Sequence, residues 1–497
     1  MWDRPCSGSD LVQPRVLGSS HPACSSRPHV KAARLGRRPE HNSRHLPELA
    51  LLLLVTGLMR ASQNAAQTTF PLIGHDLLGL SAPVVGDVAA ASSGAAVVVM
   101  LVIAARIPSS KARGALAVAL VVMATGLALL AVARQPVLFV AGALVLGAAG
   151  GLVPPILMTV FATTQSAGGQ SGGTAPGSRD RPLVLLGLAL SASLVAGPLA
   201  ETGALEAFGG DLRRAMWAFV PALLVGALVA GRLARAETVA RRGASDALAA
   251  AGPADEPPRS TVPRTTEPSD GLPAGAGAPL ATGALGVHAV DRQRGRRRVS
   301  MGDAWASQRF RVALLAQVLY AFPFVGLVVF GALLSRHAYG LGPAGAEVAF
   351  GVFFASSFLV RALMAWRSPI QHQVGLTRVA AVLAIVGLAL LGLGRGPGML
   401  MAGMIVLGVP HGLTMPLASS LVADGRLAEE LPSVNAYMTA VVQAVAVVLP
   451  PLLGISVGAL GYRETFLVLL APVALLGLAQ VLVGRPREQR QGARRAA

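Results

Sequence analysis

The chain contains about twelve apolar stretches, each close to the length that crosses a lipid bilayer. A transmembrane helix needs about 20 predominantly apolar residues. The stretches are residues 48–70, 86–106, 114–134, 136–160, 182–204, 213–234, 310–333, 345–366, 374–394, 397–421, 432–456 and 462–484. We therefore predict an all-α membrane protein with 12 transmembrane helices.

The composition supports a membrane environment. Only 13% of the 497 residues are charged and 53% are hydrophobic, with a mean hydropathy of +0.60. A soluble protein carries about a quarter charged residues. The net charge of +18 comes from basic residues in the tails and loops, a pattern that suits topology signals and anionic lipid headgroups. No nucleic-acid-binding module is visible, so we expect the bilayer, and no nucleic acid, as a partner.

Segments of low complexity divide the apolar stretches into two groups of six. The predicted organisation is a disordered cytoplasmic tail (1–46), a six-helix half (47–235), a cytoplasmic linker rich in Pro, Gly, Ala and Arg (236–308), a second six-helix half (309–484) and a basic tail (485–497). The tails, the linker and the loops on the same side hold most of the Arg. The positive-inside rule then predicts a multi-pass protein of the cytoplasmic (inner) membrane with both termini in the cytoplasm.

The two halves are related by an internal repeat. Aligned at an offset of 261, residues 106–162 match residues 367–423 at about 22 of 57 positions without a gap. The segment Gly126–Leu130, for example, reads the same as Gly387–Leu391. We expect two halves of the same orientation, related by a two-fold axis along the membrane normal.

Four polar residues lie on one face of the first apolar stretch. Arg60, Gln63, Asn64 and Gln67 follow the spacing i, i+3, i+4 and i+7, which places them on one helical stripe. A charge near mid-span is costly unless it faces a protein interior or a water-filled path. We predict that this stripe lines a substrate cavity, although an interhelical ion pair through Arg60 would also account for it.

Polar residues of the second half are candidates for the facing wall. They are Gln317, Tyr320, His411 and Gln443. His411 has Gly150 as its counterpart in the first half, so it is free to serve a substrate instead of the shared fold. The alternative for His411 and Gln443 is a plain hydrogen bond between helices.

Three carboxylates are candidates for proton coupling. Asp87 and Glu347 each follow a proline by four residues at the start of a predicted span, where a carboxylate also complements the helix dipole. Glu201 lies towards the end of the fifth span and has no equivalent in the other half. An ion pair between Glu201 and Arg60 would be broken by protonation, which offers one route to coupling.

Enzymatic chemistry is not indicated. The two cysteines, Cys6 and Cys24, are both in the N-terminal tail, and we find no metal-ligand spacing, nucleotide-binding loop or nucleophile elbow. We expect no catalytic residues, no metal and no cofactor.

The chain resembles the major facilitator superfamily. Twelve spans in two halves with a long central linker fit that family, and Gly197-Pro198 is similar to the Gly-Pro element of its exporters. Pro450-Pro451 echoes this element in the eleventh span. The resemblance implies a secondary transporter that works by alternating access, with an efflux-like character.

The chain departs from the family pattern at three points. The loop between the second and third spans keeps Arg106, Lys111 and Arg113 but lacks the usual Asp. Ala143 stands where many proton-coupled exporters carry an Arg, and Glu201 replaces the last Gly of the Gly-Pro element. Coupling through the family's usual residues is thus not expected, and Glu201 becomes the candidate that titrates.

These features predict a monomeric secondary transporter that exports a small organic solute in exchange for protons. A buried Arg favours carboxylate or phosphate, so the solute is expected to be anionic. Uptake of an anionic metabolite is the alternative direction. A non-transporting membrane sensor or scaffold, with the linker as its output, is the alternative from another class.

Overall fold

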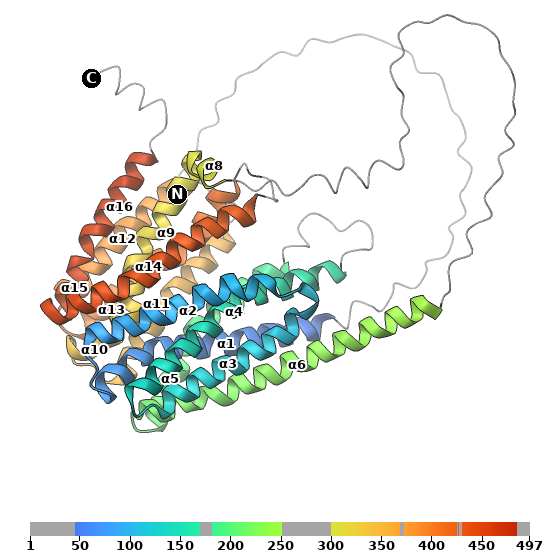
Figure 1. Ribbon diagram of the computed structural model, residues 1–497. Coiled ribbons are helices and arrows are strands. Elements are labelled where there is room, and N and C mark those ends of the chain that lie inside the picture. Colours follow the sequence, from blue (N-terminus) through green and yellow to red (C-terminus); the bar gives the residue numbers. More distant parts are fainter. Residues whose placement is uncertain are drawn as a thin grey trace, which may run out of the picture. The chain divides into compact units, whose positions relative to one another are not determined.

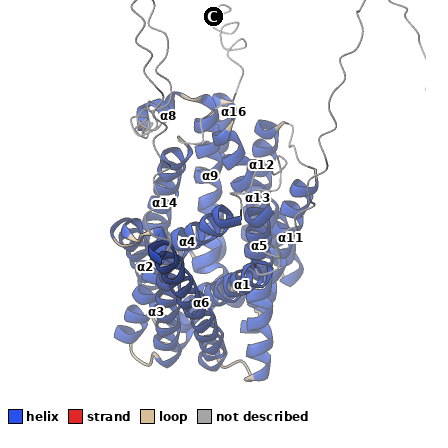
Figure 2. Ribbon diagram, turned by 90° about the vertical axis from the view of Figure 1, so that its right-hand side faces the viewer, coloured by secondary structure: helices blue, strands red, loops and turns tan. Residues whose placement is uncertain are grey.

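The computed structural model describes residues 45–168, 181–250, 300–367, 372–424, 426 and 430–484. Every regular element in this part of the chain is a helix (Figure 2). Most of the predicted tails and linker lie outside the described residues. Two long helical series remain, one on each side of the linker.

Both series contain six long helices, some of them interrupted. The first consists of α1 (His45–Leu72), which continues as the π-helix η2 (Ile73–Leu77), then α2 (Ala82–Val102), α3 (Ala112–Val132), α4 (Pro136–Gly168), α5 (Arg181–Ala207) and α6 (Leu212–Ala250), with the 3-10 turns η3 (Ala104–Arg106) and η4 (Ser109–Lys111) between α2 and α3. The second consists of the short α8 (Met301–Ala306), then α9 (Gln308–Gly326) with the π-helix η5 (Leu327–Gly331) and α10 (Ala332–His337), α11 (Pro343–Trp366), α12 (Gln373–Leu393), α13 (Pro397–Ala423), α14 (Leu431–Leu460), and α15 (Tyr462–Val468) with α16 (Leu470–Val483).

Eleven of these helices are long and apolar enough to cross a membrane. The remaining long helix, α5, has 27 residues and occupies the place of the predicted fifth span. This architecture confirms the prediction of an all-α protein with 12 transmembrane helices in two six-helix halves. We call the end at which α6 ends and α8 begins the linker end, and the other end the far end.

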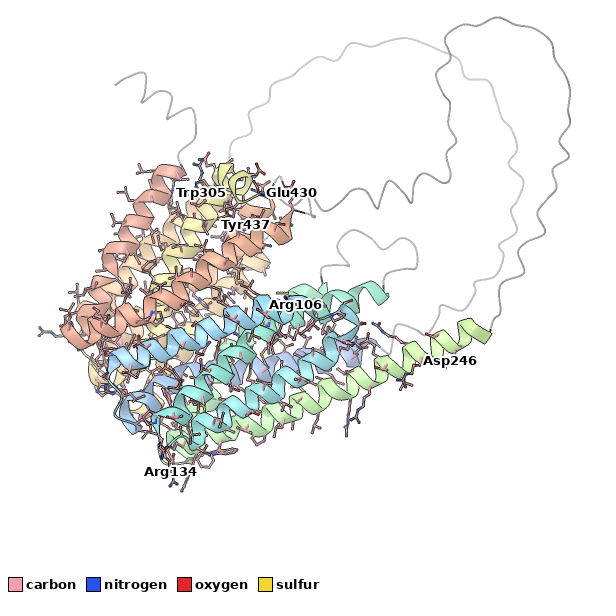
Figure 3. The ribbon with its side chains drawn as sticks, viewed as in Figure 1. Arg106, Arg134, Asp246, Trp305, Glu430 and Tyr437 are labelled. Carbon is pink, nitrogen blue, oxygen red and sulfur yellow. The ribbon has the colours of Figure 1, made fainter. Side chains whose placement is uncertain are left out.

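Consecutive helices run in opposite directions within each half. Figure 3 shows this for the first half, where Arg106, after α2, lies at the linker end and Arg134, after α3, lies at the far end. Alternation returns every second connection to the same end. The connections after α1, α3 and α5 are therefore at the far end, as are those after α10, α12 and α14.

The internal repeat appears as repeated close helix packing. A Cβ on Gly126 would press on Leu146, and a Cβ on Gly387, 261 residues later, would press on Leu407. In the same way Gly147 of α4 lies against the Ser92 backbone of α2. Small residues let helix backbones approach closely. In a lipid bilayer the hydrophobic effect does not drive helices together, so such close van der Waals packing stabilises their association.

The most extensive contacts between the halves are those of α2 with α14 and of α5 with α11. Gly86 of α2 leaves no room for a Cβ beside the Pro450 carbonyl of α14, and Gly454 faces Ala82 in the same manner. Because α2 begins and α14 ends at the far end, these contacts lie towards that end. They hold the halves in register where α1 and α10 also meet.

The helix α6 extends beyond the predicted boundary of the first half. The sequence analysis placed the start of the linker at residue 236, whereas the helix continues to Ala250 (Figure 1). Alanine and arginine favour a helix, and Glu237 pairs with Arg241 one turn later. Glu237 also lies 3.4 Å from Arg113 of α3, which in turn pairs with Glu48 of α1. This ion-pair group ties three helices together at the linker end.

The last predicted linker residues are also partly helical. The short α8 begins after Ser300, whose side chain accepts a hydrogen bond from the Asp303 backbone N–H at 3.1 Å. This is an ordinary N-cap. Trp305, on α8, packs edge-to-face with Phe310 of α9, so α8 lies against the second half.

Candidate functional site

The predicted polar stripe of α1 is present, but its four members differ. Arg60, Gln63 and Gln67 are half-buried, and the Arg60 guanidinium donates to the Gln63 side-chain oxygen at 2.9 Å. Asn64 is only 2% exposed, and its amide donates to the Leu194 carbonyl of α5 at 3.3 Å. Asn64 therefore joins α1 to α5, while the other three remain available to a solute.

Of the predicted facing residues of the second half, His411 of α13 and Tyr320 of α9 lie together. The His411 ring packs on Phe324 at a centroid distance of 4.8 Å, on Phe353 at 5.2 Å and on Tyr320 at 5.5 Å. Tyr320 is buried, and its hydroxyl lies 3.4 Å from the Leu407 carbonyl oxygen. His411 is thus the half-buried centre of an aromatic group.

Gln317 of α9 and Gln443 of α14 are half-buried as well. Among the described residues, neither amide has a hydrogen-bond partner given by the structure. Their place in a cavity wall remains a prediction.

A second arginine belongs with Arg60, and the sequence analysis missed it. Arg361 of α11 is half-buried, donates to the Ser191 hydroxyl of α5 at 3.1 Å and approaches the His411 carbonyl oxygen at 3.3 Å. Its Nε is buried and has no partner in the described part of the chain. The sequence did contain a signal for Arg361, because it is a charged residue within the predicted span 345–366, the sixth from its end. Arg60 was identified by the same kind of signal.

Arg60 and Arg361 form a positively charged pair. Each is close enough to the other, and to His411, to interact electrostatically. Within the described ranges, neither guanidinium is paired with a carboxylate. Two such groups in a half-buried setting repel each other, and an anion placed between them would relieve that repulsion.

A pair of carboxyl groups connects the halves separately from the arginines. Glu201 of α5 and Glu347 of α11 are both 0% exposed, and they lie close enough to interact electrostatically across the contact between these helices. Thr68 of α1 lies 3.2 Å from Glu201 Oε2, within hydrogen-bonding distance. The predicted ion pair between Glu201 and Arg60 is not formed, because Glu201 faces Thr68 and Glu347 instead.

Three of the four carboxyl oxygens of this pair lack a donor. Glu201 Oε1 and both Glu347 oxygens are buried and meet no N–H or O–H group in the described residues. An ionised carboxylate only accepts hydrogen bonds, whereas a protonated one also donates. A proton on either carboxyl would therefore supply the donor that the pair lacks.

The third predicted carboxylate, Asp87, is not part of this pair. It is exposed and lies on the sixth residue of α2, beyond the first turn. Glu347, which follows Pro343 as Asp87 follows Pro83, is fully buried. Because α2 begins at Ala82, Asp87 lies too far along the helix to cap its first turn.

A further polar group joins the halves at the far end. Asp76, in η2, lies 3.1 Å from Arg336 and 3.1 Å from His337, both of α10. The His75 ring nitrogen lies 2.9 Å from Asp76 Oδ1. Nearby, burial raises the pKa of the Tyr339 phenol, which keeps its proton and donates to the Leu391 carbonyl at 2.8 Å.

Two related halves of long apolar helices define a polytopic membrane protein. The sequence profile of the Major Facilitator Superfamily matches residues 49–426. The chain belongs to this superfamily, and it is accordingly a membrane transporter and not an enzyme. No curated protein matches the chain in sequence.

Solved transporters share the fold at low sequence identity. The nucleoside transporter NupG has a TM-score of 0.59 at 14% identity, covering 88% of this chain and 99% of its own. A bacterial homologue of the human lysosomal transporter Spinster, in an inward-facing and unoccupied conformation, has a TM-score of 0.59 at 13% identity over 89% and 97%. A POT family transporter in complex with 5-aminolevulinic acid has a TM-score of 0.59 at 11% identity over 88% and 97%.

Proposed function

We propose that the protein is a secondary transporter that couples proton movement to export of a small organic anion by alternating access. The observation that carries this proposal is the pair Glu201–Glu347. Its two fully buried carboxyls come from different halves of the chain. Protonation of the pair therefore acts on the contact that alternating access has to open and close.

The coupling follows from the charge of the pair. When one proton is present, a carboxyl can donate to its neighbour, and the α5–α11 contact is favourable. When both groups are ionised, they repel each other by roughly 4 kcal/mol at a separation of about 4 Å and an effective dielectric constant of about 20. Loss of the proton thus favours separation of the halves, and that separation exposes the pair to water.

The substrate wall is proposed to combine charge with an aromatic surface. Arg60 and Arg361 supply donors for a carboxylate or phosphate, and the Arg361 Nε has an unused proton. The half-buried His411 and the ring of Phe324 beside it supply a flat surface. An anion with an apolar or aromatic body fits both features.

Export is the proposed direction, and both termini are proposed to lie in the cytoplasm. The direction is supported by the resemblance of Gly197-Pro198 to the Gly-Pro element of the family's exporters. The basic tails and linker support the orientation. Uptake of an anionic metabolite is the second candidate, and the arginine pair favours it.

Transport by proteoliposomes tests the proposed function. Vesicles containing the purified protein and a pH-sensitive dye would be exposed to benzoate, citrate and phenyl phosphate as anionic probes, and to a quaternary ammonium compound as a cationic probe. We expect at least one anion to drive proton movement in the wild-type protein, and Glu201→Gln to abolish it. Binding of a probe without any flux would contradict transport and support the sensor alternative.

A further inference from the structure

The polar group at the far end has the chemistry of a metal site. His75 Nδ1, Asp76 Oδ1 and His337 Nε2 each offer one ligand atom, and these atoms all lie within 4.8 Å of one another. Asp76 Oδ1 is 2.9 Å from the His75 nitrogen and 3.1 Å from the His337 nitrogen. Donors around a tetrahedral Zn²⁺ ion are about 3.3 Å apart, so small side-chain movements would suffice.

The internal repeat explains why these residues meet. Asp76 and His337 are 261 residues apart, the offset of the repeat, and His75 stands at the same separation from Arg336. Equivalent positions of two halves approach each other only near the axis that relates the halves. The group therefore lies at the point where the far ends of both halves converge.

We propose that His75, Asp76 and His337 form a binding site for a divalent transition metal of the Zn²⁺ class, which joins the two halves at the far end. Two imidazoles and one carboxylate are a donor set that suits Zn²⁺, Cu²⁺, Ni²⁺ or Co²⁺ and not Mg²⁺ or Ca²⁺. Three protein ligands leave a coordination position for water.

The surroundings hold the ligand atoms in place. Arg336 lies 3.1 Å from Asp76 Oδ2, on the carboxylate oxygen that does not face the imidazoles. Tyr462 stacks on the His337 ring at a centroid distance of 5.4 Å and meets the His75 ring edge-on at 6.4 Å. The side chains of His75 and His337 are 29% and 38% exposed, so an ion can reach them from solvent. The charge of Arg336 opposes a cation but also orients the carboxylate, as partners outside the ligand set commonly do.

Titration calorimetry with Zn²⁺ on the purified full-length protein tests this site. Histidines elsewhere in the chain also bind Zn²⁺, so the comparison is between variants. We expect His75→Gln and His337→Gln each to lower the Zn²⁺ affinity of one site per chain by 10-fold or more. His337→Cys should keep Zn²⁺ binding at that site. His372→Asn, which changes an exposed histidine between α11 and α12, is the control and should leave that site intact.

Thermal unfolding supplies the second readout. A ligand that binds only the folded protein raises its stability in proportion to the logarithm of the ligand concentration. Zn²⁺ should therefore raise the melting temperature of the wild type and of His372→Asn more than that of the His75→Gln/His337→Gln double variant. Equal binding and equal thermal shifts in wild type and double variant would overturn the proposal. This test requires no transported solute, so it is independent of the proposed function.

Discussion

At the level of single residues, the chain carries two kinds of buried polar group, and they are separate in space and in chemistry. Arg60 and Arg361 are cations without a carboxylate partner in the described part of the chain. Glu201 and Glu347 are carboxyls without a cation partner there. Most buried charges are paired. The proposed mechanism assigns the arginines to solute binding and the carboxyls to proton binding, and these two sites are distinct.

The arginine pair leads to the first prediction. Arg361→Gln should raise the concentration of an anionic probe needed for half-maximal transport by 10-fold or more, because hydrogen bonds to charged groups contribute about 1.5–3 kcal/mol. Initial rates of probe transport in proteoliposomes measure this effect. Arg367→Gln changes an exposed arginine at the end of the same helix and is the matched control. An unchanged concentration dependence in Arg361→Gln would exclude Arg361 from the binding wall.

The sequence predicted these residues unevenly. Arg60, Gln63 and Gln67 were found because helical periodicity alone places them on one face. Asn64 shares that periodicity but is buried against α5, because the width of the exposed face depends on the neighbouring helix. The contact of Glu201 with Glu347 could not be predicted, since it depends on which faces of α5 and α11 meet across the halves.

At the level of helices, glycine positions decide how closely neighbours pack. Gly147 lies against the Ser92 backbone, where a Cβ would clash, whereas Gly114 of α3 has open space. Gly147→Val should therefore destabilise the protein by about 1–3 kcal/mol, the usual range for an overpacked contact. The same change at Gly114 controls for the helix propensity of valine. Equal melting temperatures for the two variants in detergent would show that the α2–α4 contact is not tight.

The contact between α2 and α14 gives a prediction about transport. Gly86 lies against the Pro450 carbonyl, while Gly94, two turns further along α2, has nothing within 4 Å of an added Cβ. Gly86→Val should prevent the far ends of the halves from closing and reduce probe transport at least 10-fold, with normal insertion in the membrane. Gly94→Val should transport like the wild type. Transport that is equal in both variants would show that closure does not require this contact.

The number of helices and the repeat that relates the two halves were predictable, because both can be read from short stretches of sequence without knowledge of packing. Apolar length defines a span, and residues 126–130 repeat at 387–391 without any knowledge of packing. The extension of α6 to Ala250 was missed because a charged, solvent-facing helix lacks the apolar signal used to define spans. The group of His75, Asp76 and His337 was missed for a different reason: His337 lies 261 residues after Asp76, and the two meet only when the halves assemble.

At the level of the whole molecule, polar and ionisable groups lie at the contacts between the two halves. The carboxyl pair connects α5 with α11, and the group around Asp76 connects η2 with α10. Alternating access requires such contacts to break and re-form during each cycle. In the proposed mechanism, protonation of Glu201 and Glu347 decides whether the far ends of the halves are together or apart.

The most direct test is the distance between the far ends of the two halves as a function of pH. Pulsed electron paramagnetic resonance measures this distance between two spin labels. Labels would be placed at the exposed positions Phe208 and Arg395, one in each half, after replacement of Cys6 and Cys24 by serine. We predict a short distance in acid and a shift to a longer distance in alkali, because ionisation of both carboxyls separates the halves. The double variant Glu201→Gln/Glu347→Gln keeps hydrogen-bonding groups of the same size without charge, so it should show the short distance at every pH. A distance that changes with pH equally in the wild type and in this variant would contradict the account.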